Sequence, residues 1–436
     1  MKETDFDVII VGVGTGGCTV AKILEDKGYS IALVDKKKKE DVGNKICGDA
    51  ITEECLLLME NIFGNLKEPI ENEIRESVFV FPDGSEIKLE AENTFILNRH
   101  KMGQIILNKI LKNKKIRFFD HTTVLDIKKN EIFVLDLEKN ELFSLKAKII
   151  VDASGFDALL RRSIKVKDTE SDLKHREFGV AFREIIKVKE WKKNDSCFYF
   201  LDNNKLPHGY AWIFPKGNNY LNVGLGFERI DNKNPKFSYH SFFNFKKLKV
   251  LSSGGGMIPL RRSLSNLVDD NFLMLGDAAC HVTAINGGGI HNSIIAGDLA
   301  ASTIIDALNK EKYDKETLWD YNIKFQTKYG KKLAREEILK VFVNSLSQEE
   351  LKNIMLKGKN KISFSTFKVS LYNILNLTIF ILSMKNFHLL KKCIKVLKYV
   401  QKIDKLYEDY PSEKEKLSEW DFKVKILFDK IYEDFY

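Results

Sequence analysis

Cysteine and proline are scarce in this sequence, which contains 6 and 7 of them among 436 residues. No two cysteines form a Cys-x-x-Cys pair, and no cysteine–histidine spacing suits zinc. A disulfide scaffold and a structural zinc centre are therefore excluded as classes. We expect reduced thiols and no bound metal.

Long hydrophobic runs are missing as well. The charge-free stretch at residues 369–384 is broken by polar side chains, and it is short for a membrane-spanning helix of about 20 residues. The chain enters its first expected strand almost at once, which leaves no room for a signal peptide. We therefore expect a cytoplasmic protein without a membrane-spanning helix.

Nucleic-acid-binding features are absent, although the chain is basic. Lysine and arginine number 70 against 61 for aspartate and glutamate, a net charge of +9 that is spread along the chain. Without a basic arm, a zinc finger or an aromatic–basic repeat, we expect no nucleic-acid partner. A solvated lysine-rich surface explains the excess most simply, but it would also favour anionic phosphates or lipid surfaces.

A glycine motif near the start organises the chain. The β-branched run at residues 8–11 leads into Gly12-x-Gly14-x-x-Gly17 and then into a helical pattern. Gly12 permits a tight turn, Gly14 lets backbone N–H groups approach a pyrophosphate, and Gly17 lets the helix pack close to the strand. A second strand ends at Asp35, whose carboxylate can hold a ribose hydroxyl pair. This order predicts a dinucleotide site.

A second glycine turn lies far along the chain. An expected strand ends in Gly276-Asp277, and three glycines at 287–289 precede a helix expected from Asn292 to about Leu308. Such a turn points backbone amides at an anion or a polar ring edge. Because a nicotinamide enzyme needs only the first turn, the pair predicts FAD bound in an extended form, with Asp277 accepting hydrogen bonds from its hydroxyls.

The segments between these turns predict the remaining architecture. A hairpin turns at residues 82–84, Arg99 heads a helix expected from 101 to 112, and an aromatic β-rich block spans 178–227. Arg99 could clamp a phosphate. The aromatic block favours a sheet with one ligand-facing side, although an ordinary aromatic core fits its periodicity equally well.

We therefore predict an α/β fold, in which an FAD-binding Rossmann-like lobe is interleaved with an antiparallel β-sheet substrate lobe and followed by helices. The expected parts are the FAD lobe over 1–175, interrupted by a hairpin near 78–90, the substrate lobe over 176–265, the rest of the FAD lobe over 266–330, and a helical region over 331–436.

One amphipathic helix is expected from residue 389 to 407. Its predicted apolar face consists of Leu390, Cys393, Ile394, Leu397, Val400 and Ile403, with lysines elsewhere. Packing against the protein is the default for such a helix, and contact with a membrane interface is the alternative.

The loop after the second strand contains Cys47-Gly48. A lone cysteine is more often a small buried side chain than a reactive thiol. The neighbouring glycines, and a position near the distal end of a bound dinucleotide, favour a role of Cys47 in the site.

Together these motifs resemble the geranylgeranyl reductase family, in particular the archaeal enzymes that saturate the prenyl chains of membrane lipids. The markers, which cover nearly the whole chain, are Gly12-x-Gly14-x-x-Gly17, residues 45–50 (Lys-Ile-Cys-Gly-Asp-Ala), Tyr210-x-Trp212-x-Phe214-Pro215 with Gly224-x-Gly226, residues 255–262, Gly276-Asp277 with residues 287–290, and Tyr410-Pro411. The glycine and Gly-Asp motifs are shared with the wider aromatic hydroxylase flavoprotein superfamily, whereas the Cys-Gly and Tyr-x-Trp-x-Phe-Pro motifs are more specific. The sequence departs from the family at Ala284, where a proline is usual, and this loosens the turn.

The resemblance implies an FAD-dependent oxidoreductase that saturates the isoprenoid double bonds of geranylgeranyl chains in archaeal phospholipid biosynthesis. The FAD-binding residues that it implies are Gly12, Gly14, Gly17, Asp35, Cys47, Gly48, Ala50, Arg99, Val124, Asp277, Gly288, Gly289 and Ile290. Cys47 and Tyr210 are the candidate catalytic residues, and Tyr210, Trp212 and Phe214 would line an apolar tunnel for the substrate.

The implied partners are a prenylated lipid or other geranylgeranyl substrate, an external electron donor (ferredoxin, reduced deazaflavin or NADPH) and the inner face of the cell membrane, bound peripherally. Two alternatives share the cofactor lobe or the fold. One is a flavin monooxygenase or halogenase. The other is a non-catalytic prenyl-binding escort protein, which the intact glycine turns and Asp277 argue against.

Overall fold

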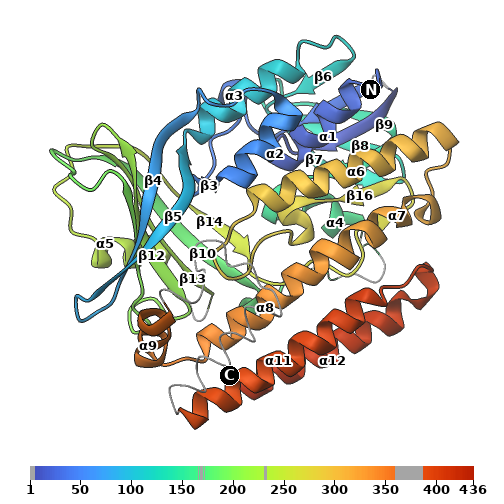
Figure 1. The fold of residues 1–436 in the computed structure, drawn as a ribbon. Helices are drawn as coiled ribbons and strands as arrows, with labels where there is room; N and C mark the ends of the chain where they lie inside the picture. The colour runs from blue at the N-terminus through green and yellow to red at the C-terminus, as the bar shows by residue number, and fades with distance from the viewer. Residues whose placement is uncertain (1–4, 165, 167–169, 171, 230–232, 359–385) are drawn as a thin grey trace.

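The computed structural model describes residues 5–164, 166, 170, 172–229, 233–358 and 386–436. The fold is mixed α/β, with two eight-stranded sheets and a helical C-terminal region, which confirms the predicted class (Figure 1). The charge-free stretch at residues 369–384 lies outside the described residues. Within the described ranges, no helix combines the length and the apolar character that crossing a bilayer requires.

The first sheet is mostly parallel and follows the predicted cofactor lobe. Its main path is β15 (Val268–Asp269), β16 (Phe272–Met274), β9 (Glu141–Asp152), β1 (Asp5–Val11), β2 (Ile31–Val34) and β6 (Ile116–Phe119), with β7 (Thr122–Lys128) and β8 (Glu131–Asp136) beside β9. The five strands from β16 to β6 are parallel neighbours. The turns that follow β1, β2, β9 and β16 therefore meet along one edge of the sheet.

The second sheet is antiparallel except where β4 meets β11. Its order is β14 (Lys249–Pro259), β10 (Phe178–Lys187), β13 (Tyr220–Glu228), β12 (Gly209–Gly217), β11 (Ser196–Phe200), β4 (Ile70–Val80), β5 (Glu86–Leu97) and β3 (Ala50–Thr52). The hairpin turn predicted at residues 82–84 is confirmed. Its strands are longer than the predicted 78–90, because β4 and β5 stay paired from Val80 and Glu86 at the turn to Ile70 and Leu97.

The helices cover the sheets and form the C-terminal layer. They are α1 (Thr15–Glu25), α2 (Glu53–Phe63), α3 (Arg99–Ile110), α4 (Leu159–Ile164), α5 (Pro235–Phe242), α6 (Ile290–Lys310), α7 (Lys315–Phe325), α8 (Lys331–Asn344), α9 (Gln348–Gly358), α11 (Phe387–Glu408) and α12 (Leu417–Phe435). Figure 1 shows α8, α11 and α12, in orange to red, running side by side along the lower side of the molecule, and contacts join all three.

Two helices begin two residues earlier than the sequence predicts. The side chain of Asn98 accepts a hydrogen bond from the N–H of Lys101 at 2.9 Å, so α3 starts at Arg99. The glycine turn itself provides the cap residue of α6, which starts at Ile290. Both shifts bring a predicted ligand-binding residue into the first turn of a helix.

The predicted apolar face of α11 is partly wrong. The buried residues are Leu389, Cys393, Val396, Tyr399, Val400, Ile403 and Tyr407. The side chain of Ile394 is 40% exposed, and those of Leu390 and Leu397 are only partly buried. The helix turns the side that contains Val396 and Tyr399 toward α8 and α12, and no pattern within α11 itself reveals where those neighbours lie.

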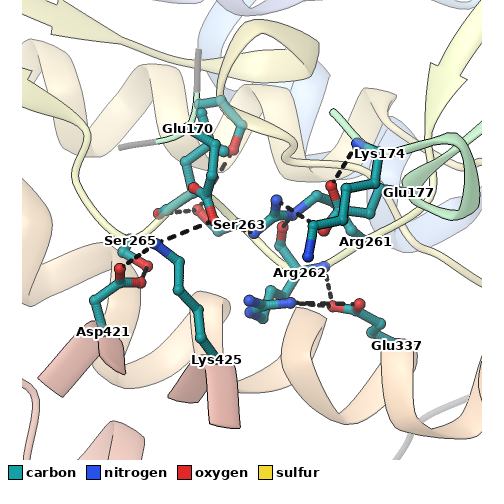
Figure 2. A network of polar contacts seen from close by, with 12 residues as sticks. Glu170, Lys174, Glu177, Arg261, Arg262, Ser263, Ser265, Glu337, Asp421 and Lys425 are labelled. Carbon is teal, nitrogen blue, oxygen red and sulfur yellow. Dashed lines mark hydrogen bonds and ion pairs between the residues drawn. The ribbon is translucent and has the colours of Figure 1, made fainter. Parts of the chain in front are cut away.

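A buried ionic network joins the segment that follows β14 to Glu177 and to the C-terminal helices α8 and α12 (Figure 2). Arg261 is fully buried and donates to Glu177 at 3.1 Å and to Glu170 at 3.3 Å, while Arg262 meets Glu337 of α8 at 3.2 Å. Removing one partner of a buried pair typically costs about 3–5 kcal/mol. Arg262 therefore fixes α8 against the segment that follows β14, whereas Arg261 fixes this segment to Glu170 and Glu177.

Candidate active site

A cavity of about 770 Å³ lies where the two sheets meet. Both glycine turns line it, together with the Cys47–Gly48 loop, the aromatic residues of β12 and part of α8 and α9. Its size lies within the range of cofactor and small-molecule sites. The tertiary structure thus brings together motifs that lie far apart in the sequence, from Gly14 in the first turn to Met355 in α9.

The three glycines of the first turn have different roles. Gly12 has φ +101°, and a Cβ there would lie 2.2 Å from the carbonyl O of Ala153. A Cβ at Gly17 would lie 2.1 Å from the carbonyl O of Gly12. A Cβ at Gly14 would meet only Lys45, at 3.6 Å. Gly12 and Gly17 are thus needed for packing, whereas Gly14 faces open space in the cavity.

Asp35 follows β2 and stabilises the same turn. Its carboxylate accepts the N–H of Val13 at 2.8 Å and the N–H of Lys37 at 2.9 Å. A carboxylate has about four acceptor positions, so two remain for ribose hydroxyls. The geometry fits the role that the spacing predicts.

Arg99 provides the clearest sign of an anionic ligand. Its side chain lines the cavity and is 9% exposed, and one guanidinium N–H reaches Thr15 Oγ1 at 3.4 Å. Its Nε has no hydrogen-bond partner among the described residues. A buried guanidinium N–H without an acceptor is costly. A phosphate oxygen beside Gly14 would satisfy it, so these residues fit a dinucleotide pyrophosphate.

The second turn presents a carboxylate to the cavity. Gly276 has φ +67°, and Asp277 lies next to Gly289, where a Cβ would be 3.2 Å from Asp277 Oδ1. Burial raises the pKa of the Asp277 carboxyl, while Lys45 and Arg99 lower it. The carboxylate can accept hydrogen bonds from hydroxyl groups, as predicted.

His281 supports this turn and was not found from the sequence. Its Nδ1 accepts the N–H of Gly276 at 3.2 Å, and its ring stacks on Phe325 with centroids 3.9 Å apart. Burial lowers the pKa of His281 to about 3, so the imidazole is neutral. A neutral ring can accept this hydrogen bond, whereas a protonated one could not.

Cys47 and the aromatic residues of β12 meet in the cavity, as predicted. Cys47 is half-buried, while the other five cysteines are buried, and all six are free thiols. A Cβ at Gly48 would lie 2.9 Å from the ring of Phe214, so the loop packs directly on that ring. The hydroxyl of Tyr210 donates to the carbonyl O of Asn286 at 2.8 Å. Burial, with Cys47 nearby, raises the pKa of Tyr210 to about 12.

Some predicted residues do not line the cavity. Gly12, Asp35 and Gly288 belong to or adjoin the two turns but are not lining residues, Ala50 begins β3, and Val124 is buried within β7. Their roles as FAD-binding residues stay predictions. By contrast Gly14, Gly17, Arg99, Asp277, Gly289 and Ile290 all line the cavity.

The cavity also has an apolar wall that the sequence did not indicate. Its residues come from α8 and α9 and include Leu339, Phe342, Val343, Leu351, Ile354 and Met355. Their helical spacing is typical of ordinary core packing, so only the position of these helices against the second sheet reveals the wall. A long hydrocarbon chain fits such a lining better than a compact polar substrate.

Two glycine turns on one edge of a parallel sheet, facing an aromatic antiparallel sheet, define a flavoprotein oxidoreductase. Residues 178–258 match the family model of the geranylgeranyl reductase catalytic domain. The chain is similar to a digeranylgeranylglycerophospholipid reductase from Sulfolobus acidocaldarius, with 29% identity over 96% of each chain. Among solved structures, it resembles a geranylgeranyl bacteriochlorophyll reductase-like protein from Thermoplasma acidophilum, with TM-score 0.78 and 21% identity over 92% of this chain and 100% of that chain.

A flavin-dependent brominase shares the fold more distantly, with TM-score 0.66 and 14% identity over 88% of this chain and 99% of that chain. The resemblance to the geranylgeranyl reductases is confirmed by these matches, and with it the predictions of an FAD-dependent oxidoreductase and of the FAD cofactor.

Proposed function

We propose that this protein is an FAD-dependent reductase that saturates the isoprenoid double bonds of geranylgeranyl chains in the biosynthesis of archaeal membrane glycerophospholipids. The proposal rests on one observation. The cofactor turns, Cys47 and the apolar residues of β12, α8 and α9 all line the same cavity. The flavin-dependent brominase is only 14% identical and shares the fold alone, so it does not favour halogenation over alkene reduction.

FAD, when bound in its reduced form, supplies the hydride for an isolated alkene. Arg99 and the N–H groups beside Gly14 would bind the pyrophosphate, and Asp35 and Asp277 would accept hydrogen bonds from cofactor hydroxyls. Cys47–Gly48 and the Gly288–Gly289 turn, of which Gly289 lines the cavity, would lie beside the isoalloxazine ring. Tyr210, Trp212 and Phe214 hold the prenyl chain and exclude water from it.

The proton for the neighbouring alkene carbon comes from Cys47. Its sulfur accepts the N–H of Asp49 at 3.3 Å, which leaves the S–H free to point into the cavity. Tyr210 is the poorer candidate, because its O–H is donated to Asn286 and burial raises its pKa to about 12. Thiols are in general stronger acids than phenols.

The functional test combines purified protein, reduced FAD and a geranylgeranylated glycerophospholipid under anaerobic conditions, followed by mass spectrometry of the lipid. We expect the lipid to gain two hydrogens for each double bond. Ferredoxin, reduced deazaflavin and NADPH are then compared as electron donors. Oxygen-dependent addition of oxygen to a substrate, with no saturated lipid, would contradict the proposal and identify a monooxygenase.

We further propose that α11 contacts the inner, anionic face of the cell membrane from the cytoplasm. One exposed row along α11 follows a helical spacing and contains Phe387, Lys391, Ile394, Lys398, Lys402 and Lys405. Lysines flanking exposed apolar side chains suit an anionic lipid surface.

Vesicles that contain anionic lipid should bind wild type and release it in high salt. Lys391→Glu with Lys398→Glu should weaken binding, whereas Lys112→Glu with Lys114→Glu, at two exposed lysines just after α3, should not. Equal binding by all variants would contradict a role of α11 in membrane contact.

A further inference from the structure

Asn222 lies at the centre of the second sheet, beside the proposed reactive thiol. It belongs to β13, where it is opposite Phe214 of β12 and Ile185 of β10. Residues opposite each other in a sheet project to the same face. Asn222 therefore shares the cavity-facing side with Phe214, yet its side chain is fully buried.

Every hydrogen-bonding group of the Asn222 amide is used. Its Oδ1 accepts the indole N–H of Trp212 at 3.0 Å, and its Nδ2 donates to the carbonyl O of Cys47 at 2.8 Å and to Asp49 Oδ2 at 2.9 Å. An indole N–H can only donate, and a carbonyl or carboxylate can only accept. The partners thus fix which way the amide points.

Gly224 makes this arrangement possible. It lies opposite Trp212, and a Cβ there would be 2.4 Å from Trp212 Cζ2. The indole lies over the bare backbone of Gly224, and from there its N–H reaches Asn222. The Gly224-x-Gly226 motif thus provides the space that lets Trp212 and the loop share one amide.

The loop itself needs an external anchor. Asp49 is 3% exposed and has φ +67°, a left-handed conformation that is unusual for residues other than glycine. Its Oδ2 is shared by Asn222 and Lys216, whose Nζ lies 2.9 Å away. Arg183 adds a contact to the carbonyl O of Lys45 at 3.0 Å.

We propose that Asn222 is the positioning residue of the reaction: through its contacts with Trp212, Cys47 and Asp49, it fixes the Cys47 thiol against the wall that holds the alkene. The inference rests on the proposed function for its catalytic consequence, but not for the structural one. Without the amide, the hydrogen-bonded link from Trp212 through Asn222 to the loop is lost, and the thiol is no longer held in one place.

The decisive variant is Asn222→Asp, which keeps the size of the side chain but replaces the NH₂ group with an acceptor. The new carboxylate would face the carbonyl O of Cys47 and the Asp49 carboxylate, and both would repel it. We expect iodoacetamide to alkylate Cys47 about tenfold faster in the FAD-bound variant, since the loss of about one hydrogen bond to a charged group is worth that factor. Intact-protein mass spectrometry counts the adduct, and Cys47→Ser identifies the thiol.

Asn322→Ala is the matched control. Asn322 is also a fully buried amide, and it donates to Asn266 and accepts the N–H of Leu267, away from the cavity. Its loss should lower the melting temperature without changing Cys47 alkylation or the flavin absorbance spectrum. If Asn222→Asp does not fold, Asn222→Ser, which keeps a hydroxyl donor without the charge, takes its place.

Lipid reduction gives the second measurement. We expect kcat to fall by about tenfold or more in the Asn222 variant, with a smaller change in KM, because positioning is lost rather than binding. Equal alkylation and equal kcat in the Asn222 and Asn322 variants would overturn the inference. If wild type reduces no lipid at all, the proposed function fails, while alkylation and the flavin spectrum still decide the role of Asn222.

Discussion

The two ends of the cavity are built in different ways. At the cofactor end, on the edge of the first sheet, the surface is mostly backbone: Gly12, Gly14 and Gly17 shape one turn and Gly276 begins the other. At the substrate end, on the second sheet, the surface consists of side chains, and Trp212, Asn222 and the Cys47 loop hold one another through hydrogen bonds. The cofactor end thus depends on glycines, which have no Cβ, whereas the substrate end depends on contacts between side chains.

This difference determines what each end tolerates. A backbone site fails when a side chain enters the space of the ligand, but the protein around it can stay intact. A side-chain site fails gradually, because each hydrogen bond contributes only about 0.5–1.5 kcal/mol net. A variant at the cofactor end should therefore block ligand binding in an intact fold, whereas a variant at the substrate end should weaken the site by a graded amount.

The largest effect is expected at Gly14. This residue has φ −84° and ψ −175°, a conformation that valine adopts readily, and a Cβ would meet only Lys45 at 3.6 Å. Gly14→Val should therefore fold, yet lose FAD affinity by about a hundredfold or more, because the valine occupies the space of the pyrophosphate. Flavin absorbance after gel filtration measures the bound FAD, and circular dichroism measures the fold.

Gly17→Val is the informative contrast at the same turn. A Cβ there would lie 2.1 Å from the carbonyl O of Gly12, so this variant should fail to fold or should melt far below wild type. If Gly14→Val binds FAD normally, the cofactor end does not hold the pyrophosphate at this glycine, and the comparison breaks down.

The next effect tests the substrate end at Cys47. Cys47→Ala and Cys47→Ser should both bind FAD and accept electrons from dithionite, because neither alters the glycine turns at the cofactor end of the cavity. Both should lose alkene reduction by about a hundredfold, which is the usual worth of a general acid. Turnover within a few-fold of wild type in both variants would contradict the acid role and point to Tyr210 or a water molecule.

The smallest effect concerns Glu336, a side chain that supports the backbone-built end. It is 2% exposed, bonds Thr283 beside the second glycine turn, and lies 3.9 Å from Lys332. Burial raises its pKa from 4.5 to about 7. Between these values the folded state holds a proton that the unfolded state has lost, so stability falls as the pH rises through this window.

Glu336→Gln should remove that loss. We expect the variant to be more stable than wild type at pH 8 by on the order of 2 kcal/mol, because one pKa unit corresponds to about 1.4 kcal/mol and part of the Lys332 attraction is lost. At pH 4 the two proteins should be nearly equal. Denaturant melts at both pH values measure the difference, and a pH-independent difference would show that the pKa of Glu336 is the same in the folded and unfolded states.

The two ends also differ in how well the sequence predicts them. The turn at Gly12–Gly17 and Asp35 was predicted because every residue lies within one βαβ unit, where spacing alone fixes the geometry. The apolar wall from α8 and α9 was missed, because its spacing equals that of ordinary core packing. The buried face of α11 was partly wrong for a related reason, since Val396 and Tyr399 lie between lysines and only α8 and α12 select that side.

The sequence by itself thus determined the two cofactor turns, the strands that lead into them, Cys47-Gly48 and the Tyr-x-Trp-x-Phe-Pro strand, because these are local patterns with fixed backbone consequences. Only the tertiary structure decided that Asn222 anchors the Cys47 loop and that His281 supports the second turn through Gly276. It also decided that Arg262 of the 255–262 motif pairs with Glu337 of α8, while Arg261 pairs with Glu170 and Glu177. The physical reason is that a hydrogen bond between residues far apart in the chain depends on sheet register and helix docking. Neither can be derived from the sequence separation of the two residues.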